Sequence, residues 1–290
     1  MSIDFLLTAL LQGLGYASLA LGVFLSLRIF NIPDITTDGS FTAGGAVTAI
    51  LLTQHYHPLI VLIVAVFAGM IAGTTTGLIL TRFKIQPLLA GILTMTALYS
   101  VNLAIMGRSN IPLIDTYDIF QFTHITNLSG SYIVVMVIAV LMLITKLYYI
   151  LRTDFGIAMR ATGNSEQMVR SMGVNTDRMK ITGLAIANGL TAFSGYLITQ
   201  YQGFADINMG LGIVISGLGS VMIGEALFKK RIKKSIIYSL IAVIIGSVAF
   251  RIIIAMALSL GLNPNYLKIV TAAIVLLIVG LSTSGKRKNQ

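Results

Sequence analysis

The chain has 290 residues, of which 56% are hydrophobic and only 10% are charged, whereas soluble domains carry about 25% charged residues. So few polar side chains cannot cover a water-facing exterior, so most of the surface must face lipid. The absence of cysteine excludes a disulfide framework, thiolate metal sites and cysteine nucleophiles. The net charge of +10 could indicate a nucleic-acid partner, and the positions of the basic residues, described below, argue against one.

Apolar segments follow one another along almost the whole chain. The first, 5–27, has no Lys or Arg before it and no small-x-small site after it, which favours a membrane span over a cleavable signal. Segment 40–54 is short for a span, and segment 211–228 is rich in glycine. The other segments are long enough to cross about 30 Å of hydrocarbon. The nine apolar segments are 5–27, 40–54, 58–80, 85–107, 131–150, 181–201, 211–228, 235–258 and 266–282.

The basic residues indicate how a nine-span chain is oriented. Seventeen of the 20 fall on one side, and only Arg108, Arg251 and Lys268 remain. Positive residues collect on the cytoplasmic side of membrane proteins, so we expect an outside N-terminus and an inside C-terminus. These short clusters flank membrane spans and contain no nucleic-acid motif, so we expect no nucleic-acid partner.

The order of the segments repeats with reversed direction. Span 5–27 is followed by a polar turn, a short helix at 40–54 and two spans. Span 181–201 is followed by a polar turn, the short helix 211–228 and two more spans. Inverted repeats with interrupted helices at matching positions are typical of transporters. We therefore expect an all-α integral membrane fold in one transmembrane domain, 1–290, with a first half 1–107, a linking span and cytoplasmic loop 131–180, a second half 181–282 and a basic tail 283–290.

The cytoplasmic loop 151–180 contains helix signals. Asn164 as N-cap with Gln167 three residues on forms a capping-box pattern, and Gly173 suits the position just after a helix, which predicts a helix at 165–172. A second start signal follows at Asn175, with Asp177 in the first turn of the next span.

Helix 165–172 is too short to be stable alone. Met168, Val169 and Met172 are expected to form one apolar face on it. Such a face fits a partner's groove, since methionine adapts to irregular surfaces. A surface helix lying on the membrane is the alternative, and the pattern leaves both open.

Three stretches resemble the permeases of the branched-chain amino-acid-type ABC importer superfamily, nearest its branch of uncharacterised or tryptophan-type permeases. They are the run from Phe155 to Lys180 with the following Ser194-Gly195, the turn from Asn31 to Phe41, and the run from Gly217 to Phe228. The resemblance implies an importer with a cytoplasmic ABC ATPase dimer, a second permease copy or paralogue and an extracytoplasmic solute-binding protein, in the inner membrane of a bacterium. It also implies that the loop helix couples to the ATPase, through Arg160, Asn164, Gln167, Met168, Val169, Met172 and Gly173.

Polar residues at the first helix break are candidates for a substrate path, because free backbone groups and hydroxyls at membrane depth can line one. The alternative is a cytoplasmic turn in which Ser40 or Asp38 caps helix 40–54. Arg251 lies inside a span, where a charge is costly, so it either faces a cavity and attracts a carboxylate or pairs with Asp206 or reaches the outer interface. The candidates are Asp34, Thr36, Thr37, Asp38, Ser40 and Arg251.

Other polar residues have plainer interpretations. Glu225 is expected to form a structural salt bridge near the inner end of its segment, and the outer loop 108–130 is a candidate surface for the binding protein. His55, His57 and His124 lack metal-site spacing, so we expect no metal and no cofactor.

The chain contains no ATPase motif, so ATP hydrolysis is expected in a separate subunit and the chain itself is not expected to be an enzyme. The favoured function is therefore the permease subunit of an ATP-driven importer for a small solute, with an amino acid as the favoured solute. An ion-coupled secondary transporter is the alternative, although ionisable groups near the middle of the membrane are scarce.

Overall fold

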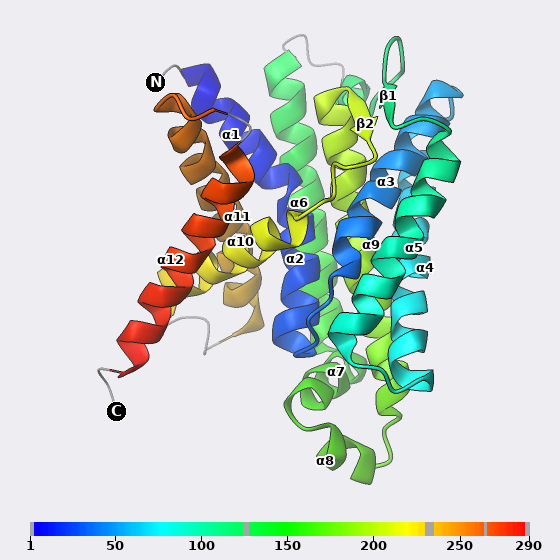
Figure 1. Cartoon of the computed structure of the whole chain (residues 1–290), viewed down its shortest axis with the longest axis vertical. Coiled ribbons are helices and arrows are strands. Elements are labelled where there is room, and N and C mark those ends of the chain that lie inside the picture. The colour runs from blue at the N-terminus through cyan, green and yellow to red at the C-terminus, as the bar shows by residue number, and fades with distance from the viewer. Residues whose placement is uncertain (1–2, 124–127, 230–234, 264–265, 288–290) are drawn as a thin grey trace.

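The computed structural model describes residues 3–123, 128–229, 235–263 and 266–287. The chain is a bundle of helices with one small sheet (Figure 1). His124, the basic residues within 230–234 and the end of the basic tail, 288–290, lie outside the described residues. The helices are α1 (Ile3–Gly15), α2 (Ala17–Phe24), a π-helical segment (Leu25–Ile29), α3 (Thr36–Thr53), α4 (Pro58–Arg82), α5 (Pro87–Met106), a 3-10 segment (Ile119–Thr123), α6 (Leu128–Arg152), α7 (Asp154–Asn164), α8 (Glu166–Ser171), α9 (Thr176–Gln202), α10 (Ile213–Leu227), α11 (Ile236–Ser259) and α12 (Leu267–Arg287).

Each of the nine predicted apolar segments coincides with helix in the structure. Six helical stretches in the described residues are long and apolar enough to cross a membrane, while α10 and Leu267–Ile278 of α12 are shorter. Helix α3 begins at Thr36, four residues before the predicted start of its segment. The six long stretches are Phe5–Ile29, Pro58–Arg82, Pro87–Met106, Gly130–Arg152, Thr176–Gln202 and Ile236–Ser259.

Helix α9 forms the centre of the bundle and packs against α2, α3 and α4. Its contact with α4 depends on glycine, because a Cβ at Gly73 would stand 2.2 Å from the carbonyl oxygen of Leu184 and one at Gly69 2.5 Å from that of Asn188. Backbones this close need small residues on the facing side. The regular glycine spacing in segment 58–80 therefore marks the α4–α9 contact.

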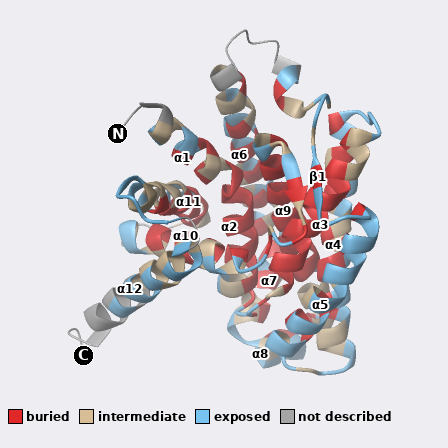
Figure 2. Cartoon of the chain, turned by 45° about the horizontal axis from the view of Figure 1, so that its top comes forward, coloured by how far each residue is buried: buried red, intermediate tan, exposed pale blue. Residues whose placement is uncertain are grey.

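A second group of helices is built around α10 and α11 in the same manner. A Cβ at Gly224 would stand 2.2 Å from the carbonyl oxygen of Ala242, and one at Gly246 would stand 2.0 Å from that of Ser220. Helix α10 also packs against α12 and α2. Figure 2 shows that burial concentrates on α2, α3 and α9, while the outward sides of α4, α5 and α12 are exposed.

One end of the bundle contains a two-stranded antiparallel sheet, which the all-α expectation did not include. Strand β1 (Asn110–Pro112) follows α5, and β2 (Phe204–Asp206) follows α9, with Ile111 opposite Ala205. The sheet ties together the ends of two helices that are distant in sequence. Helices α7 and α8 project from the opposite end of the bundle (Figure 1).

Candidate functional site

The helix break before α3 is closed by hydrogen bonds from its own side chains. The Asp34 carboxylate accepts a hydrogen bond from the backbone N–H of Thr36 at 2.9 Å, and the Thr37 hydroxyl donates to the Asp34 carbonyl at 3.2 Å. Asp34 therefore satisfies the free backbone donor at the start of the helix. The expectation that Ser40 or Asp38 caps this helix is wrong, because both residues lie inside it.

A buried polar network joins this helix break to α9. Asn188 donates from Nδ2 to Asp34 Oδ2 at 2.7 Å, and Ser40 Oγ donates to Asn188 Oδ1 at 2.6 Å. The hydroxyl oxygens of Thr36 and Thr76 lie 2.8 Å apart, which links α3 to α4. Buried polar groups are tolerated when they are paired with one another. In this conformation the network holds three helices together, and the path role of Asp34, Thr36, Thr37 and Ser40 stays a prediction.

Asp38 reaches the other half of the chain. Its carboxylate accepts hydrogen bonds from the backbone N–H groups of Gly212 at 2.8 Å and Val214 at 2.9 Å, at the start of α10. An acidic side chain at a helix N-terminus satisfies free donors and complements the helix dipole. Gly210 is required beside it, because a Cβ there would stand 2.0 Å from the Asp38 carbonyl oxygen.

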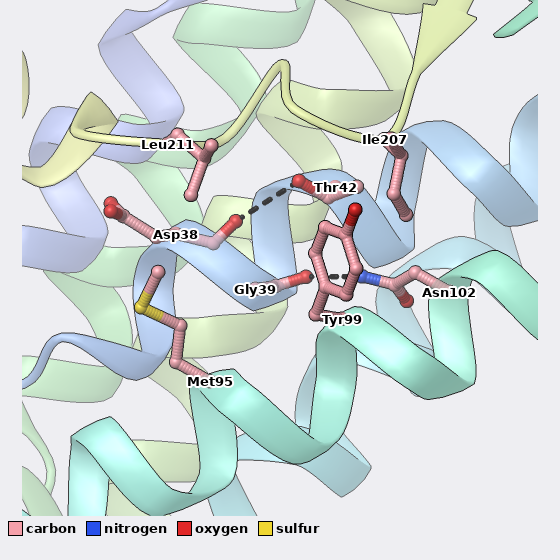
Figure 3. Close-up of a pocket in the computed structure, with 8 residues that line it drawn as sticks. All are labelled: Asp38, Gly39, Thr42, Met95, Tyr99, Asn102, Ile207 and Leu211. Carbon is pink, nitrogen blue, oxygen red and sulfur yellow. Dashed lines mark hydrogen bonds between the residues drawn. The ribbon is translucent and has the colours of Figure 1, made fainter. Parts of the chain in front are cut away.

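A small cavity of about 20 Å³ lies beside Asp38 (Figure 3). It is formed by α3, α5 and the segment between β2 and α10. The side chain of Asn102 in α5 donates from Nδ2 to the Gly39 carbonyl at 3.0 Å, while its Oδ1 is buried without a hydrogen-bond partner among the described residues. The cavity is lined by Asp38, Gly39, Thr42, Met95, Tyr99, Asn102, Ile207 and Leu211.

Arg251 contacts an aromatic ring rather than an acid. Its guanidinium carbon lies 3.5 Å from the ring centroid of Tyr16, and Tyr16 in turn stacks on Phe41 of α3 at 5.7 Å. Asp206 is engaged elsewhere, because its carboxylate accepts from the backbone N–H of Asn208 at 2.8 Å. The proposed Arg251–Asp206 pair is therefore absent from the described contacts, and a cation–π contact takes its place.

Glu225 of α10 forms a salt bridge with Arg28 of the π-helical segment. The contact ties the end of α10 to the turn that precedes α3. It confirms the expected structural salt bridge and identifies its partner, which lies 197 residues away in sequence.

The loop 151–180, predicted to be cytoplasmic, contains two helices where the sequence predicts one. Helix α7 begins after Thr153, whose hydroxyl accepts from the backbone N–H of Gly156 at 3.3 Å. It packs tightly on the bundle, because a Cβ at Gly163 would stand 1.9 Å from the Ile29 carbonyl oxygen and Met159 is fully buried. Helix α7 was not predicted, although Phe155 and Met159 are spaced by four residues and pack in one apolar cluster with Phe30.

The predicted helix 165–172 corresponds to α8, which begins one residue later and ends one residue earlier. Ser165, not Asn164, is the N-cap, since its hydroxyl accepts from the backbone N–H of Met168 at 3.4 Å and Asn164 ends α7. Gly173 has a φ of +84°, so the expected glycine after the helix is confirmed.

The three apolar residues of α8 do not share one exposed face. Val169 is buried against the loop, whereas Met168 and Met172 are exposed. Gln167 is also exposed, and Arg160 on α7 is half-buried, with its Nε donating to the Gly156 carbonyl at 3.4 Å. The two methionines are left as an apolar tip at the end of the molecule.

Glu166 anchors α8 to the start of α9. Its carboxylate contacts Lys180 Nζ at 2.6 Å and Arg170 Nη2 at 3.1 Å, and it accepts from the Thr176 hydroxyl at 3.2 Å. The hydrogen bond from Lys180 is the main reason that the pKa of Glu166 lies below its usual value. The i to i+4 spacing of Glu166 and Arg170 was visible in the sequence, but the contact with Lys180 depends on the turn between the helices.

The opposite end of the bundle has a larger, polar pocket of about 340 Å³ between the 110–123 segment, α6 and the end of α9. Gln200 Oε1 accepts from the backbone N–H of Ile119 at 2.9 Å and positions this segment. Burial raises the pKa of Asp118, whose carboxylate accepts from the backbone N–H of Gln121 at 2.9 Å. The pocket lies within the outer loop predicted as a docking surface.

Comparison with known proteins gives consistent matches over nearly the whole chain. Residues 5–279 match the family described as branched-chain amino acid transport system, permease component. A tyrosine transport system permease protein of Clostridioides difficile is 38% identical over 98% of this chain and 94% of its own length. An uncharacterised protein of Rickettsia prowazekii is 33% identical over 97% of this chain and 98% of its length. A ribose import permease of Haemophilus influenzae is 23% identical over 97% of this chain and 85% of its length. No solved structure matches the chain.

Proposed function

The chain belongs to the branched-chain amino acid transport system permease family, and we propose that it is the membrane permease subunit of an ATP-driven importer for an amino acid. The proposed solute follows from the relatives. The tyrosine transport permease is 38% identical, whereas the ribose import permease of Haemophilus influenzae is 23% identical over a similar length. The greater identity to the tyrosine permease favours an amino acid, and an aromatic one in particular.

The observation on which the proposal rests is the exposed tip of α8. Met168 and Met172 project from the end of the molecule while Val169, Glu166 and Lys180 fix the helix to its base. A six-residue helix held this firmly with two exposed methionines suits a groove on a rigid partner. The proposed partner is a cytoplasmic ABC ATPase dimer, because the chain contains no ATPase motif of its own.

The membrane arrangement proposed for the chain has nine spanning or interrupted segments in two inverted halves. The packing supports it, since α3 with α4 and α5 corresponds to α10 with α11 and α12 in both order and contacts. Helix α1 begins at the end where the sheet lies, and α12 runs toward the end with α7 and α8 (Figure 1). With the basic residues on the α8 side, the N-terminus is outside and the C-terminus inside.

A continuous set of contacts leads from α8 toward the helix breaks. Helix α7 packs on Ile29 and Phe30, which directly precede the turn containing Asp34. Beyond that turn, Asp38 holds the start of α10. ATP-driven movement of the ATPase subunits would displace α8 and α7 and so shift both interrupted helices together. An extracytoplasmic binding protein delivers the solute at the other end, and a second copy or a paralogue completes the path.

The test is purification of the chain from mild detergent, with ATPase activity assayed in the eluate. We expect an ATPase to co-purify and to be lost when Met168 and Met172 are both replaced by Asp. Phe83→Asp is the matched control, because Phe83 is 72% exposed and Met172 73% exposed, and Phe83 lies in the loop after α4. Co-purification that survives M168D/M172D would contradict the coupling role. A chain that never brings down an ATPase would contradict the proposed function and favour uptake driven by an ion gradient.

A further inference from the structure

The side-chain amide of Asn102 has a hydrogen-bond partner for its nitrogen but none for its oxygen among the described residues. Its Nδ2 donates to the Gly39 carbonyl at 3.0 Å, and this bond fixes which way the amide points, since the reversed amide would set two oxygens against each other. Asn102 is only 1% exposed, and its Oδ1 has no hydrogen-bond partner among the described residues. A buried acceptor without a donor is destabilising, because it has lost its hydrogen bonds to water and gained none in return. The site therefore favours a ligand that brings an N–H or O–H group.

The cavity beside Asn102 has room for one small group. At about 20 Å³ it exceeds the roughly 10–15 Å³ that a single water needs, and an ammonium group has about the same size. The only formal charge among the lining residues is that of Asp38, whose carboxylate accepts two hydrogen bonds from the start of α10, so the lining offers no positive charge to attract an anion. Tyr99 lines the cavity next to Asn102, and Figure 3 shows its ring beside the amide, whereas Met95 lies nearer Asp38.

The face of α5 around the cavity is poorly suited to lipid. Tyr99 and Ser100 are exposed, and neither hydroxyl forms a hydrogen bond with any described residue. Exposed Thr75 on α4 differs, because its hydroxyl donates to the Ile71 carbonyl of its own helix. Hydroxyls without partners are costly in hydrocarbon, so this face of α5 is expected to meet water.

We propose that Asn102 is the residue that receives the ammonium group of the transported amino acid, with the rest of the solute packed against the ring of Tyr99. The inference rests on the proposed function, which it extends by naming the group recognised inside the membrane. The cavity admits only the ammonium group, and the exposed aromatic ring beside it offers a flat surface to an aromatic side chain. Access to the buried oxygen requires Tyr99 or Met95 to move, as expected of a path that opens alternately to the two sides.

The natural absence of cysteine allows a direct test. Ser100→Cys is introduced into the full chain, purified with its partners in proteoliposomes, and treated with a water-soluble methanethiosulfonate without ATP. Ser100 is used because it is exposed beside Tyr99 but does not line the cavity. Leu78→Cys on α4 is the control, because Leu78 is also exposed. We expect S100C to react and L78C not to react. An equal mixture of L-tyrosine, L-phenylalanine and L-tryptophan should slow the S100C reaction, while the corresponding 3-arylpropionates, which lack the ammonium group, should not.

Asn102→Leu in the S100C background tests the residue itself. A charge-assisted hydrogen bond contributes about 1.5–3 kcal/mol, so the concentration of amino acids needed for protection should rise by roughly 10- to 150-fold. Thr94→Val, on the same helix, should leave protection unchanged, because the Thr94 hydroxyl bonds only the Ala90 carbonyl of its own helix.

The outcomes separate this inference from the proposed function. Equal protection by the arylpropionates, or unchanged protection in N102L, would mean that the cavity holds a water only, and the inference would be overturned. These labelling results do not depend on ATP. Failure of an ATPase to co-purify would overturn the proposed function, whereas absence of protection in the S100C protein with an intact Asn102 and a bound ATPase would overturn only the role of Asn102.

Discussion

The Asp38 carboxylate in α3 accepts a hydrogen bond from the backbone N–H of Gly212, 174 residues later in the chain. A second bond from Val214 completes the cap on α10. An interrupted helix in the first half thus stabilises the start of its counterpart in the second half, and the two helix breaks are mechanically connected.

Asp38→Ala should lower the stability of the purified protein by about 2 kcal/mol, because two backbone donors at the start of α10 lose their acceptor. Asp38→Asn should cost less, since its amide oxygen can still accept one bond. Thermal unfolding in detergent measures both. Thr48→Val is the control, because the Thr48 hydroxyl bonds only the Gly44 carbonyl of its own helix. If T48V lowered the stability as much as D38A, the effect of D38A could not be assigned to the lost cap on α10.

Arg251 and Tyr16 should be energetically coupled. A desolvated cation–π contact contributes about 1–2 kcal/mol, so Arg251→Gln and Tyr16→Leu should each destabilise the protein, and the double mutant should lose less than the sum. Tyr16→Phe keeps the ring and loses only the hydroxyl, so it should cost less than Tyr16→Leu. Additive losses in the double-mutant cycle would show that the 3.5 Å contact contributes nothing.

The anchoring of α8 should depend on pH through Glu166. The pKa of Glu166 in the folded protein is lowered from 4.5, so its contribution is fully present above pH 4.5 and is lost as the pH falls through the lower folded value. Hydrogen exchange of the α8 amides should accordingly rise only at acidic pH. Glu166→Gln should show fast exchange at pH 7 and remove the pH dependence. A Glu166→Gln profile identical to wild type would assign the anchoring to other contacts.

Gly73→Ala should disrupt the contact between α4 and α9. The new Cβ would stand 2.2 Å from a backbone oxygen of Leu184, so the helices must separate, at a cost of about 1–3 kcal/mol. Gly280→Ala on α12 is the control, because nothing lies within 4 Å of the corresponding Cβ. The elution volume on size-exclusion chromatography and the unfolding temperature are measured for both variants. If G73A and G280A had the same unfolding temperature, α4 and α9 would lie farther apart than described.

Much of the helical framework could be predicted from the sequence. The apolar segments are long, and local signals such as Gly173 and the Asn175 cap depend only on neighbouring residues. The predicted cap at Asn164 failed by one residue because Ser165 offers the same chemistry one position later. Helix α7 was missed because its apolar face is short, with Phe155 and Met159 in one cluster, and because part of its burial comes from glycine contacts with Ile29 and Leu151 that no sequence pattern reveals.

The candidate site was harder to predict because its contacts are distant in sequence. The partner of Asp38 is a pair of backbone N–H groups in the other half, which no side-chain pattern reveals. Arg251 was expected to attract a carboxylate, to pair with Asp206 or to reach the outer interface, yet its contact is the ring of Tyr16. On α8, the sequence grouped Val169 with two methionines, and only packing shows that Val169 faces inward.

Helix α9 has a consequence for biogenesis. It supplies Asn188 to the buried Asp34 and Ser40 and the backbone against which the α4 glycines pack, yet it is synthesised more than a hundred residues after them. Until α9 enters the membrane, the acid and hydroxyls around the start of α3 lack their amide partner and α4 lacks its tightest neighbour. The first half therefore cannot reach its final packing while the ribosome is still translating the linking span, and insertion of α9 is the step that makes this packing possible.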